Sequence, residues 1–292
     1  MNTVTVKLSP LEEAGLKATL ESEGFEFRVI PHAAFSAKGQ GVNCTAYRSG
    51  KCVVQGKGTE QFIDRYLSAH KPDGPSVAAA LDFAVTCVGS DESGKGDFFG
   101  PLVVAAVVMG PEDLPHFEGV AIDDSKKLSA RQMHESARLI KEVLAYETVV
   151  LMPQRYNELY AQIGNLNNLL AWAHGVALEG ALEKRDAQKV VVDQFCRREL
   201  IVSRMKERTL TKELEIRPKA ESNPACGAAS ILASTTFGWK LKDLGEQFNL
   251  SLPKGAGRPV DLAARRLVAA QGKGVLYQVA KVHFANSKRV GG

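Results

Sequence analysis

From residue 83 onward, short apolar runs alternate with long segments of helical periodicity, and this alternation restricts the possible folds more than any other feature. Strand-like runs lie at 83–89, 101–108, 147–152, 189–193 and 213–218. Apolar periodicity and capping residues predict helices over 129–144 and 167–184, and a further helix that begins at Asn223 and Pro224. Strands that alternate with long helices are typical of an α/β domain with a largely buried sheet.

The first 69 residues have shorter segments and a hairpin signal. Strand-like runs lie at 4–8, 25–30, 42–48 and 51–56, and a short helical stretch lies at 59–67. After the first run, Ser9, Pro10 and Glu12 supply the N-cap, first-turn proline and capping-box acid of a helix. We therefore expect a small α+β domain over 1–70, a proline- and glycine-containing linker over 71–78, and an α/β domain over 79–292.

Composition argues against several classes of protein. The chain is 45% hydrophobic with a net charge of +4, as in ordinary globular proteins that tolerate a polyanionic partner. Its 5 cysteines are odd in number and contain no C-x-x-C pair, so neither a disulfide framework nor a zinc site is indicated. The longest apolar run, 101–109, is too short to cross a bilayer, and the N-terminus lacks the pattern of a signal peptide. We expect a cytoplasmic monomer with no membrane partner.

Acidic side chains stand where the predicted strands end. Asp91 and Glu92 end one β-branched strand, Asp193 ends another, and Glu221 lies just before the helix capped by Asn223. Ligands of open α/β sheets bind at the edge where strands end, so these acids could meet there. Clustered carboxylates repel unless a cation lies among them. Oxygen ligands select Mg²⁺ or Mn²⁺, and two such ions about 3.5–4 Å apart can drive phosphodiester hydrolysis.

A simpler interpretation competes for each acid. A single Asp at a strand end is usually a turn former or a helix N-cap, and this alternative stays open for Asp193 and Glu221. Asp91 with Glu92 is harder to explain by packing, because G-K-G follows almost at once. That stretch lacks the spacing of a nucleotide-binding phosphate loop. With Ser93, the segment Gly94-Lys95-Gly96 instead predicts a close backbone approach to a sugar-phosphate, with Lys95 as a point charge.

The N-terminal segment 27–59 carries basic residues and no acids. Its 5 basic residues are Arg28, Lys38, Arg48, Lys51 and Lys57, interspersed with the aromatic residues Phe27, Phe35 and Tyr47. This pattern suits contacts to nucleic-acid phosphates with packing on sugars or bases, and a solvated sheet face is an equal alternative. From Lys254 to the end, 8 basic residues accompany a single acid, Asp261, which predicts a second electrostatic contact region.

With these residues in view, the chain resembles the ribonuclease HIII family of type 2 ribonucleases H over essentially its whole length. The segments that carry the resemblance are D-E-S-G-K-G-D-F-F-G-P-L at 91–102, D-D-S-K-K-L at 123–128, V-V-V-D-Q-F at 190–195, K-A-E-S with G-A-A-S-I-L-A within 219–233, and A-K-V-H-F-A-N at 280–286. Each segment alone is weak, and five in the family's order are highly specific.

The resemblance implies a ribonuclease H-like catalytic domain with a mixed central sheet flanked by helices. It implies an endonuclease that cuts the RNA strand of RNA–DNA hybrids to 3′-hydroxyl and 5′-phosphate ends, with Mg²⁺ or Mn²⁺. Asp91, Glu92 and Asp193 would be metal ligands, and Glu221 would take the fourth place, where many relatives have a shorter aspartate. The N-terminal domain, including Y-R-S-G-K-C-V-V-Q-G-K-G at 47–58, resembles the family's TATA-binding-protein-like domain, which holds the hybrid.

The resemblance also bears on substrate contacts. Ser125, Lys126 and Lys127 are predicted to bind phosphates, with a capped helix start and solvent-facing lysines as the alternative. Discrimination of RNA requires sensing of a 2′-hydroxyl, and Gly94, Lys95 and Gly96 are the candidates. His283, in an apolar context, is expected to be a packed core residue.

One segment differs from the corresponding segment of ribonuclease HII in a way that bears on substrate specificity. Ribonuclease HII carries an aromatic residue in a K-G-Y-G segment, whereas this chain has Lys254-Gly255-Ala256-Gly257. This difference argues against efficient incision at single ribonucleotides embedded in DNA. Such incision, as in ribonuclease HII, and noncatalytic binding of hybrids remain the two alternatives.

Overall fold

The computed structural model describes residues 2–67, 83–120, 122 and 128–290. The chain divides into two compact units, Met1–Asp73 and Gly74–Gly292, and each is described by itself. The predicted linker over 71–78 lies outside the described residues.

The N-terminal unit is an antiparallel sheet with two helices. Its elements are β1 (Asn2–Lys7), α1 (Pro10–Ser22), β2 (Glu26–Arg28), β3 (Ala33–Gly39), β4 (Val42–Tyr47), β5 (Lys51–Gly56) and α2 (Thr59–Tyr66). The strand order is β1-β5-β4-β3-β2. As predicted, Ser9 and Glu12 form a reciprocal capping box at the start of α1. Alternate strand residues such as Ala37, Cys44 and Val54 form one core with Leu20 of α1 and Phe62 of α2, so both helices cover the same face.

The larger unit is built on a mixed five-stranded sheet in the order β10-β9-β6-β7-β8. Its strands are β6 (Cys87–Ser93), β7 (Leu102–Met109), β8 (Ala145–Leu151), β9 (Lys189–Asp193) and β10 (Glu213–Arg217). β10, β9 and β6 run parallel, whereas β7 is antiparallel to both β6 and β8. All five strands were predicted, and the α/β fold class with a mixed sheet is confirmed.

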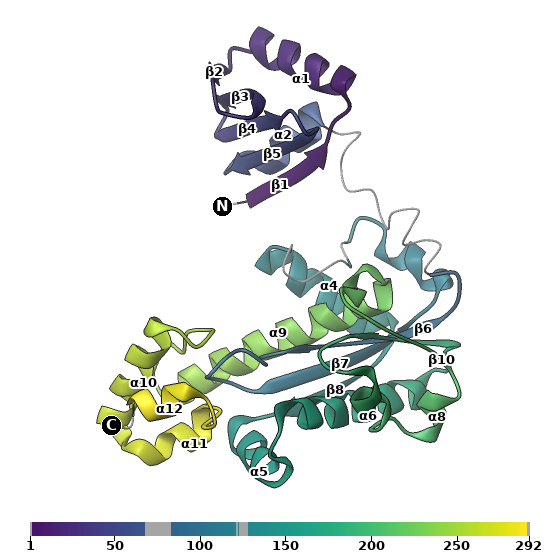
Figure 1. The fold of residues 1–292 in the computed structure, drawn as a ribbon, viewed down its shortest axis with the longest axis vertical. Coiled ribbons are helices and arrows are strands. Elements are labelled where there is room, and N and C mark those ends of the chain that lie inside the picture. The colour runs from purple at the N-terminus through teal and green to yellow at the C-terminus, as the bar shows by residue number, and fades with distance from the viewer. Residues whose placement is uncertain (1, 68–82, 121, 123–127, 291–292) are drawn as a thin grey trace. The chain divides into compact units, whose positions relative to one another are not determined.

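Helices cover both faces of this sheet (Figure 1). The helices in the described part of this unit are η2 (Pro111–Phe117), α4 (Ala130–Val143), α5 (Pro153–Ile163), α6 (Leu166–Lys184), α7 (Arg198–Val202), α8 (Glu207–Leu210), η4 (Ala220–Ser222), α9 (Pro224–Gln247), α10 (Arg258–Gln271), η5 (Lys273–Val275), α11 (Leu276–Val279) and α12 (Ala285–Val290). Of these, α10, α11 and α12 gather at one end of α9 (Figure 1). α4 and α9 pack on one face and α6 on the other, with separate cores. No helix in the described ranges is long and apolar enough to cross a membrane.

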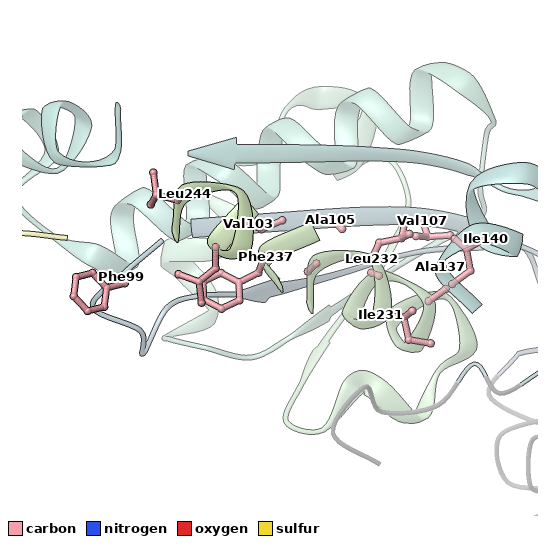
Figure 2. Packing of buried hydrophobic residues seen from close by; sticks show 14 of the residues in the cluster. Phe99, Val103, Ala105, Val107, Ala137, Ile140, Ile231, Leu232, Phe237 and Leu244 are labelled. Carbon is pink, nitrogen blue, oxygen red and sulfur yellow. The ribbon is translucent and has the colours of Figure 1, made fainter. Parts of the chain in front are cut away.

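Strand β7 is buried on both faces, which explains its unbroken apolar sequence. Figure 2 shows Val103, Ala105 and Val107 of β7 beside Leu232 of α9 and Ile140 of α4. The intervening residues of β7 belong to the core on the α6 side. This double burial fixes the sheet between the two helical layers and thereby fixes the positions of the strand ends.

Helix α9 lies unusually close to β6 at its start. A Cβ atom added to Gly89 of β6 would lie 2.2 Å from the backbone nitrogen of Cys226, so only glycine permits this approach. Asn223 caps the helix and Pro224 stands in its first turn, as the sequence predicts. The close approach brings the first turns of α9 beside the end of β6.

Candidate active site

One pocket of about 350 Å³ lies where β6 and β9 end beside α9. Its lining consists of Asp91, Glu92, Ser93, Gly94, Lys95, Gly96, Asp193, Glu221, Ser230 and Ser234. The four acids and the segment 93–96, which were singled out from the sequence, therefore lie together. Four acidic side chains with one lysine leave a surplus of negative charge in this pocket.

Sheet topology brings the acids together. β6 and β9 are parallel neighbours whose register runs to the pair Ser90 and Val192, so Asp91 and Asp193 follow at adjacent positions. The backbone N–H of Ala220 donates to Asp193 Oδ1 at 3.1 Å. This hydrogen bond ties the end of β9 to η4, which carries Glu221. The predicted meeting of strand-end acids thus has a clear structural basis.

Asp91 and Glu92 point to opposite sides of β6 and have different surroundings. Burial, reinforced by the negative charge of Glu92, raises the pKa of Asp91 to about 6, although Ser230 and the Glu92 N–H donate to its carboxylate. Burial also acts to raise the pKa of Glu92, but contacts with His174 and Lys95 outweigh it and lower that pKa. The two neighbours therefore titrate apart, with Glu92 the more acidic.

The raised pKa of Asp91 predicts a stability cost in the metal-free protein. The folded state binds the Asp91 carboxyl proton more tightly than the unfolded chain does. Protonated Asp91 therefore contributes to the unfolding free energy below about pH 4, and this contribution is lost as the pH rises through about 6. Asp91→Asn removes the charge, and we expect it to raise the unfolding free energy at pH 7.5 by about 1–3 kcal/mol. Thermal melts in chelator at pH 7.5 and 4.5 test this, since the gain should shrink at pH 4.5. An equal gain at both pH values would contradict the assignment.

The donor chemistry of the pocket suits a hard divalent cation. All four acidic ligand candidates offer oxygen atoms, the donor type that Mg²⁺ and Mn²⁺ prefer. Within the described part of the chain, no three His, Cys, Asp or Glu side chains converge closely enough to enclose one ion. Instead Asp91, Glu92 and Asp193 accept hydrogen bonds from protein groups. The residues thus fit a metal by type and location, while their carboxylates face protein donors.

The segment 94–96 divides into a structural glycine and an open one. Gly94 has φ +88°, and an added Cβ would lie 2.2 Å from the Pro101 carbonyl oxygen. For Gly96, no atom of the described residues outside its chain neighbours lies within 4 Å of an added Cβ. Between them, Lys95 Nζ lies 3.3 Å from Glu92 Oε1, so the lysine is paired with an acid of the pocket. Gly94 therefore serves the turn, and Gly96 is the position open to a ligand.

This contrast gives a matched pair of variants. Gly94→Ala is expected to lower the unfolding free energy by about 3 kcal/mol, because of both the clash and the positive φ. Gly96→Ala should change stability by less than about 0.5 kcal/mol and raise KM if the substrate backbone passes there. Urea unfolding and steady-state cleavage measure the two effects. If Gly96→Ala were destabilised as much as Gly94→Ala, the space beside Gly96 would not be open to a side chain or a ligand.

Two residues beside the site were missed from the sequence. His174 of α6 contacts Glu92, and Phe195 packs on the His174 ring. A histidine within an apolar helix is a weak signal, because most such residues are ordinary core residues. Phe195 lies in the V-V-V-D-Q-F segment, so its proximity to Asp193 was the available clue.

The other predicted contact residues are not part of the pocket lining or lie outside the described residues. Ser125, Lys126 and Lys127 fall outside the described residues. Arg48, Lys51 and Lys57 belong to the N-terminal unit, where all three are exposed. Of the aromatic residues in that stretch, Phe27 and Phe35 pack with the core, with ring centroids 5.8 Å apart. They are therefore not exposed platforms for bases.

The N-terminal sheet nevertheless presents basic side chains on the face opposite its helices. Strand alternation places Arg28, Lys38 and Lys51 on that face, and the pairing of Lys51 with Lys7 adds a fourth cation that the sequence prediction omitted. All four are exposed. We call Lys7, Arg28, Lys38 and Lys51 the basic sheet face. Arg28 lies 4.0 Å from Glu26, which precedes it by two residues on β2.

The C-terminal basic residues are less available than predicted. Lys281 is fully buried, and its Nζ donates to the carbonyl oxygens of Asp97 at 2.8 Å and Gly100 at 2.7 Å. Burial lowers the pKa of Lys281 to about 7. Arg289 pairs with Asp261 at 2.9 Å. These two residues make contacts within the fold. Fewer than the eight basic residues counted from the sequence are therefore available to a nucleic acid.

His283 differs from its expected role as a packed core residue. The side chain is exposed, and its ring stacks on Tyr160 with centroids 4.0 Å apart. It does not line the pocket. The expectation of a core residue was wrong. The His283 ring packs on the Tyr160 ring at the surface of the protein instead of entering the core.

Comparisons with known proteins agree with this architecture. The family described as ribonuclease HII matches residues 88–287, and a domain of unknown function, DUF3378, matches residues 3–77. A ribonuclease HIII of Chlamydia abortus is 37% identical over 287 residues, which are 95% of this chain and 93% of that protein. One of Protochlamydia amoebophila is 35% identical over 273 residues, 91% and 89% of the two chains. The crystal structure of Bst-RNase HIII in complex with Mn²⁺ is similar, with a TM-score of 0.69, 30% identity and coverage of 99% and 98%.

Proposed function

The chain belongs to the ribonuclease HII family, within the ribonuclease HIII type, and from this premise we propose that it is a metal-dependent endoribonuclease acting on RNA–DNA hybrids. The observation that carries the proposal is the pocket in which Asp91, Glu92, Asp193 and Glu221 lie together. Hydrolysis would cut the RNA strand and leave 3′-hydroxyl and 5′-phosphate ends. Bound Mg²⁺ or Mn²⁺ would activate water and stabilise the leaving oxygen.

The chain's own residues would position this chemistry. Asp91 and Glu92 present carboxylates from one strand, Asp193 from its parallel neighbour, and Glu221 from η4. The solved manganese complex of Bst-RNase HIII supports a divalent ion as the cofactor. Lys95 would reduce the negative charge beside Glu92, and Gly96 would admit the backbone of the RNA strand. Ser93 lines the same pocket as a polar contact.

We propose that the basic sheet face of the N-terminal unit holds the hybrid through phosphate contacts. Its four exposed cations stand on one side of the sheet, with Arg48 and Lys57 exposed just beyond strand ends. Such contacts supply affinity without reading sequence. This proposal includes action as a monomer in the cytoplasm, where a reducing environment suits the free cysteines of the described chain.

Hybrid cleavage is favoured over incision at single ribonucleotides by one local feature. The segment Lys254–Gly257 lies against the turn after G-K-G, since Phe98 N–H donates to the Gly255 carbonyl at 2.9 Å. Ala256 stands in this segment, and its methyl side chain offers no aromatic ring to a nucleotide. A recognition element for an isolated ribonucleotide is therefore missing at this position.

Cleavage of two labelled duplexes tests the proposed function. One is a continuous RNA–DNA hybrid and the other is DNA with a single ribonucleotide, each incubated with Mg²⁺ or Mn²⁺ and with chelator as the control. We expect metal-dependent cutting of the hybrid at several sites. Strong incision at the single ribonucleotide would favour the ribonuclease HII activity, and binding without any cleavage would favour a noncatalytic module.

A further inference from the structure

A fully buried imidazole lies directly behind the candidate metal site. His174 of α6 has no exposed surface, and both of its ring nitrogens have partners. Nδ1 lies 2.9 Å from Ser90 Oγ, and Nε2 lies 3.2 Å from Glu92 Oε2. The surrounding core is apolar, so these two polar contacts are what distinguish the position from an ordinary core site.

The geometry assigns a direction to this chain of hydrogen bonds. Ser90 and Glu92 are two residues apart on β6, so both face the layer that contains α6. An ionised carboxylate oxygen can only accept, so Nε2–H donates to Glu92. In the neutral ring Nδ1 then carries no hydrogen and accepts from the Ser90 hydroxyl. The imidazole thus bridges the two side chains and fixes one rotamer of Glu92.

The same ring also contacts the strand that carries Asp193. Phe195, two residues beyond Asp193, stacks on His174 with centroids 4.8 Å apart and planes inclined by 22°. Lys95 Nζ lies 5.6 Å from the centroid of Phe195 and 3.3 Å from Glu92 Oε1. Each oxygen of Glu92 is therefore held by a different residue, and one imidazole touches both ligand-bearing segments.

We propose that His174 is a positioning residue for the metal site. It orients the Glu92 carboxylate and, through Phe195, sets the spacing between the ends of β6 and β9. This inference rests on the proposed function and extends it to a residue outside the pocket lining. A residue needed only to fill the core would require no hydrogen-bonding nitrogens, whereas outer partners of this kind determine ligand orientation in metal sites.

Two substitutions separate hydrogen bonding from packing. In His174→Gln the amide nitrogen can reach the place of Nε2 and donate to Glu92, whereas in His174→Asn the shorter amide reaches only toward Ser90. The readouts are Mn²⁺ affinity of the full-length protein without substrate, measured by titration calorimetry, and kcat and KM on the hybrid. We expect His174→Asn to weaken Mn²⁺ binding by roughly 10–100-fold and to lower kcat with KM nearly unchanged. His174→Gln should stay within about threefold of the wild type.

Asn157→Ala serves as the control for lost stability. Asn157 is buried, and its amide donates to the carbonyls of Tyr277 at 3.1 Å and Ala280 at 2.8 Å, apart from the pocket. Its loss should lower the melting temperature and leave Mn²⁺ affinity unchanged. Wild-type Mn²⁺ affinity in His174→Asn, or equal impairment of the Gln and Asn variants, would overturn the positioning role. A wild-type protein that neither binds Mn²⁺ nor cuts the hybrid would instead overturn the proposed function, and this inference with it.

Discussion

Replacing Asp193 by asparagine is expected to abolish hybrid cleavage, lowering kcat on the order of 10³-fold or more while the fold and hybrid affinity persist. Asp193 ends β9 in the pocket, and its Oδ1 accepts the Ala220 N–H at 3.1 Å. Asparagine keeps the volume and this acceptor oxygen but removes the negative charge. Metal-assisted charge stabilisation is worth several kcal/mol, which corresponds to rate factors of this size.

Single-turnover cleavage with saturating Mg²⁺ measures the loss, and fluorescence anisotropy with a labelled hybrid in chelator measures affinity. Asp186→Asn is a matched control, because Asp186 is an aspartate paired with Lys212 at 2.6 Å outside the pocket lining. Its cleavage rate should match the wild type. Retained turnover in Asp193→Asn would remove Asp193 from the metal site.

The elements of the larger unit were predictable wherever periodicity and capping agreed. The segment 101–108 is apolar at every position because β7 is buried on both faces, and Asn223 with Pro224 marked the start of α9. In the N-terminal unit, β3 was missed. Its sequence A-A-F-S-A-K-G is rich in alanine, serine and glycine, which have little intrinsic preference for strands, and only pairing with β2 and β4 makes it one.

The acids of the site were predictable because strand-end carboxylates carry a chemical signal of their own. Parallel pairing of β6 with β9, which places Asp91 beside Asp193, had to come from the structure. Contacts between distant segments had no local signal. The sequence alone predicts that Lys281 is a surface cation. Tertiary packing instead buries it among the carbonyl oxygens of residues 97–100. His174 was hidden in the same way, since its partners lie on another element.

Removing residues 1–70 is expected to raise KM for the hybrid on the order of 10–100-fold near 0.15 M salt, with kcat changed by only a few fold. The basic sheet face is lost with this unit, and each phosphate contact contributes about 0.9 to the slope of log affinity against log salt. The pocket and its two flanking cores lie wholly in the other unit, so the catalytic groups stay in place.

A full-length variant that carries Arg28→Gln, Lys38→Gln and Lys51→Gln tests the same contacts without a truncation. Like the truncation, this variant should have a higher KM. The slope of log affinity against log salt should fall in magnitude by about 2 to 3, because three cations are removed. Steady-state cleavage at several salt concentrations, with thermal melts to verify folding, provides both numbers. Contacts made equally in the ground state and the transition state change KM and leave kcat unchanged. An unchanged KM in both proteins would refute substrate binding by this face, and a large fall in kcat would mean that the N-terminal unit helps to form the catalytic geometry.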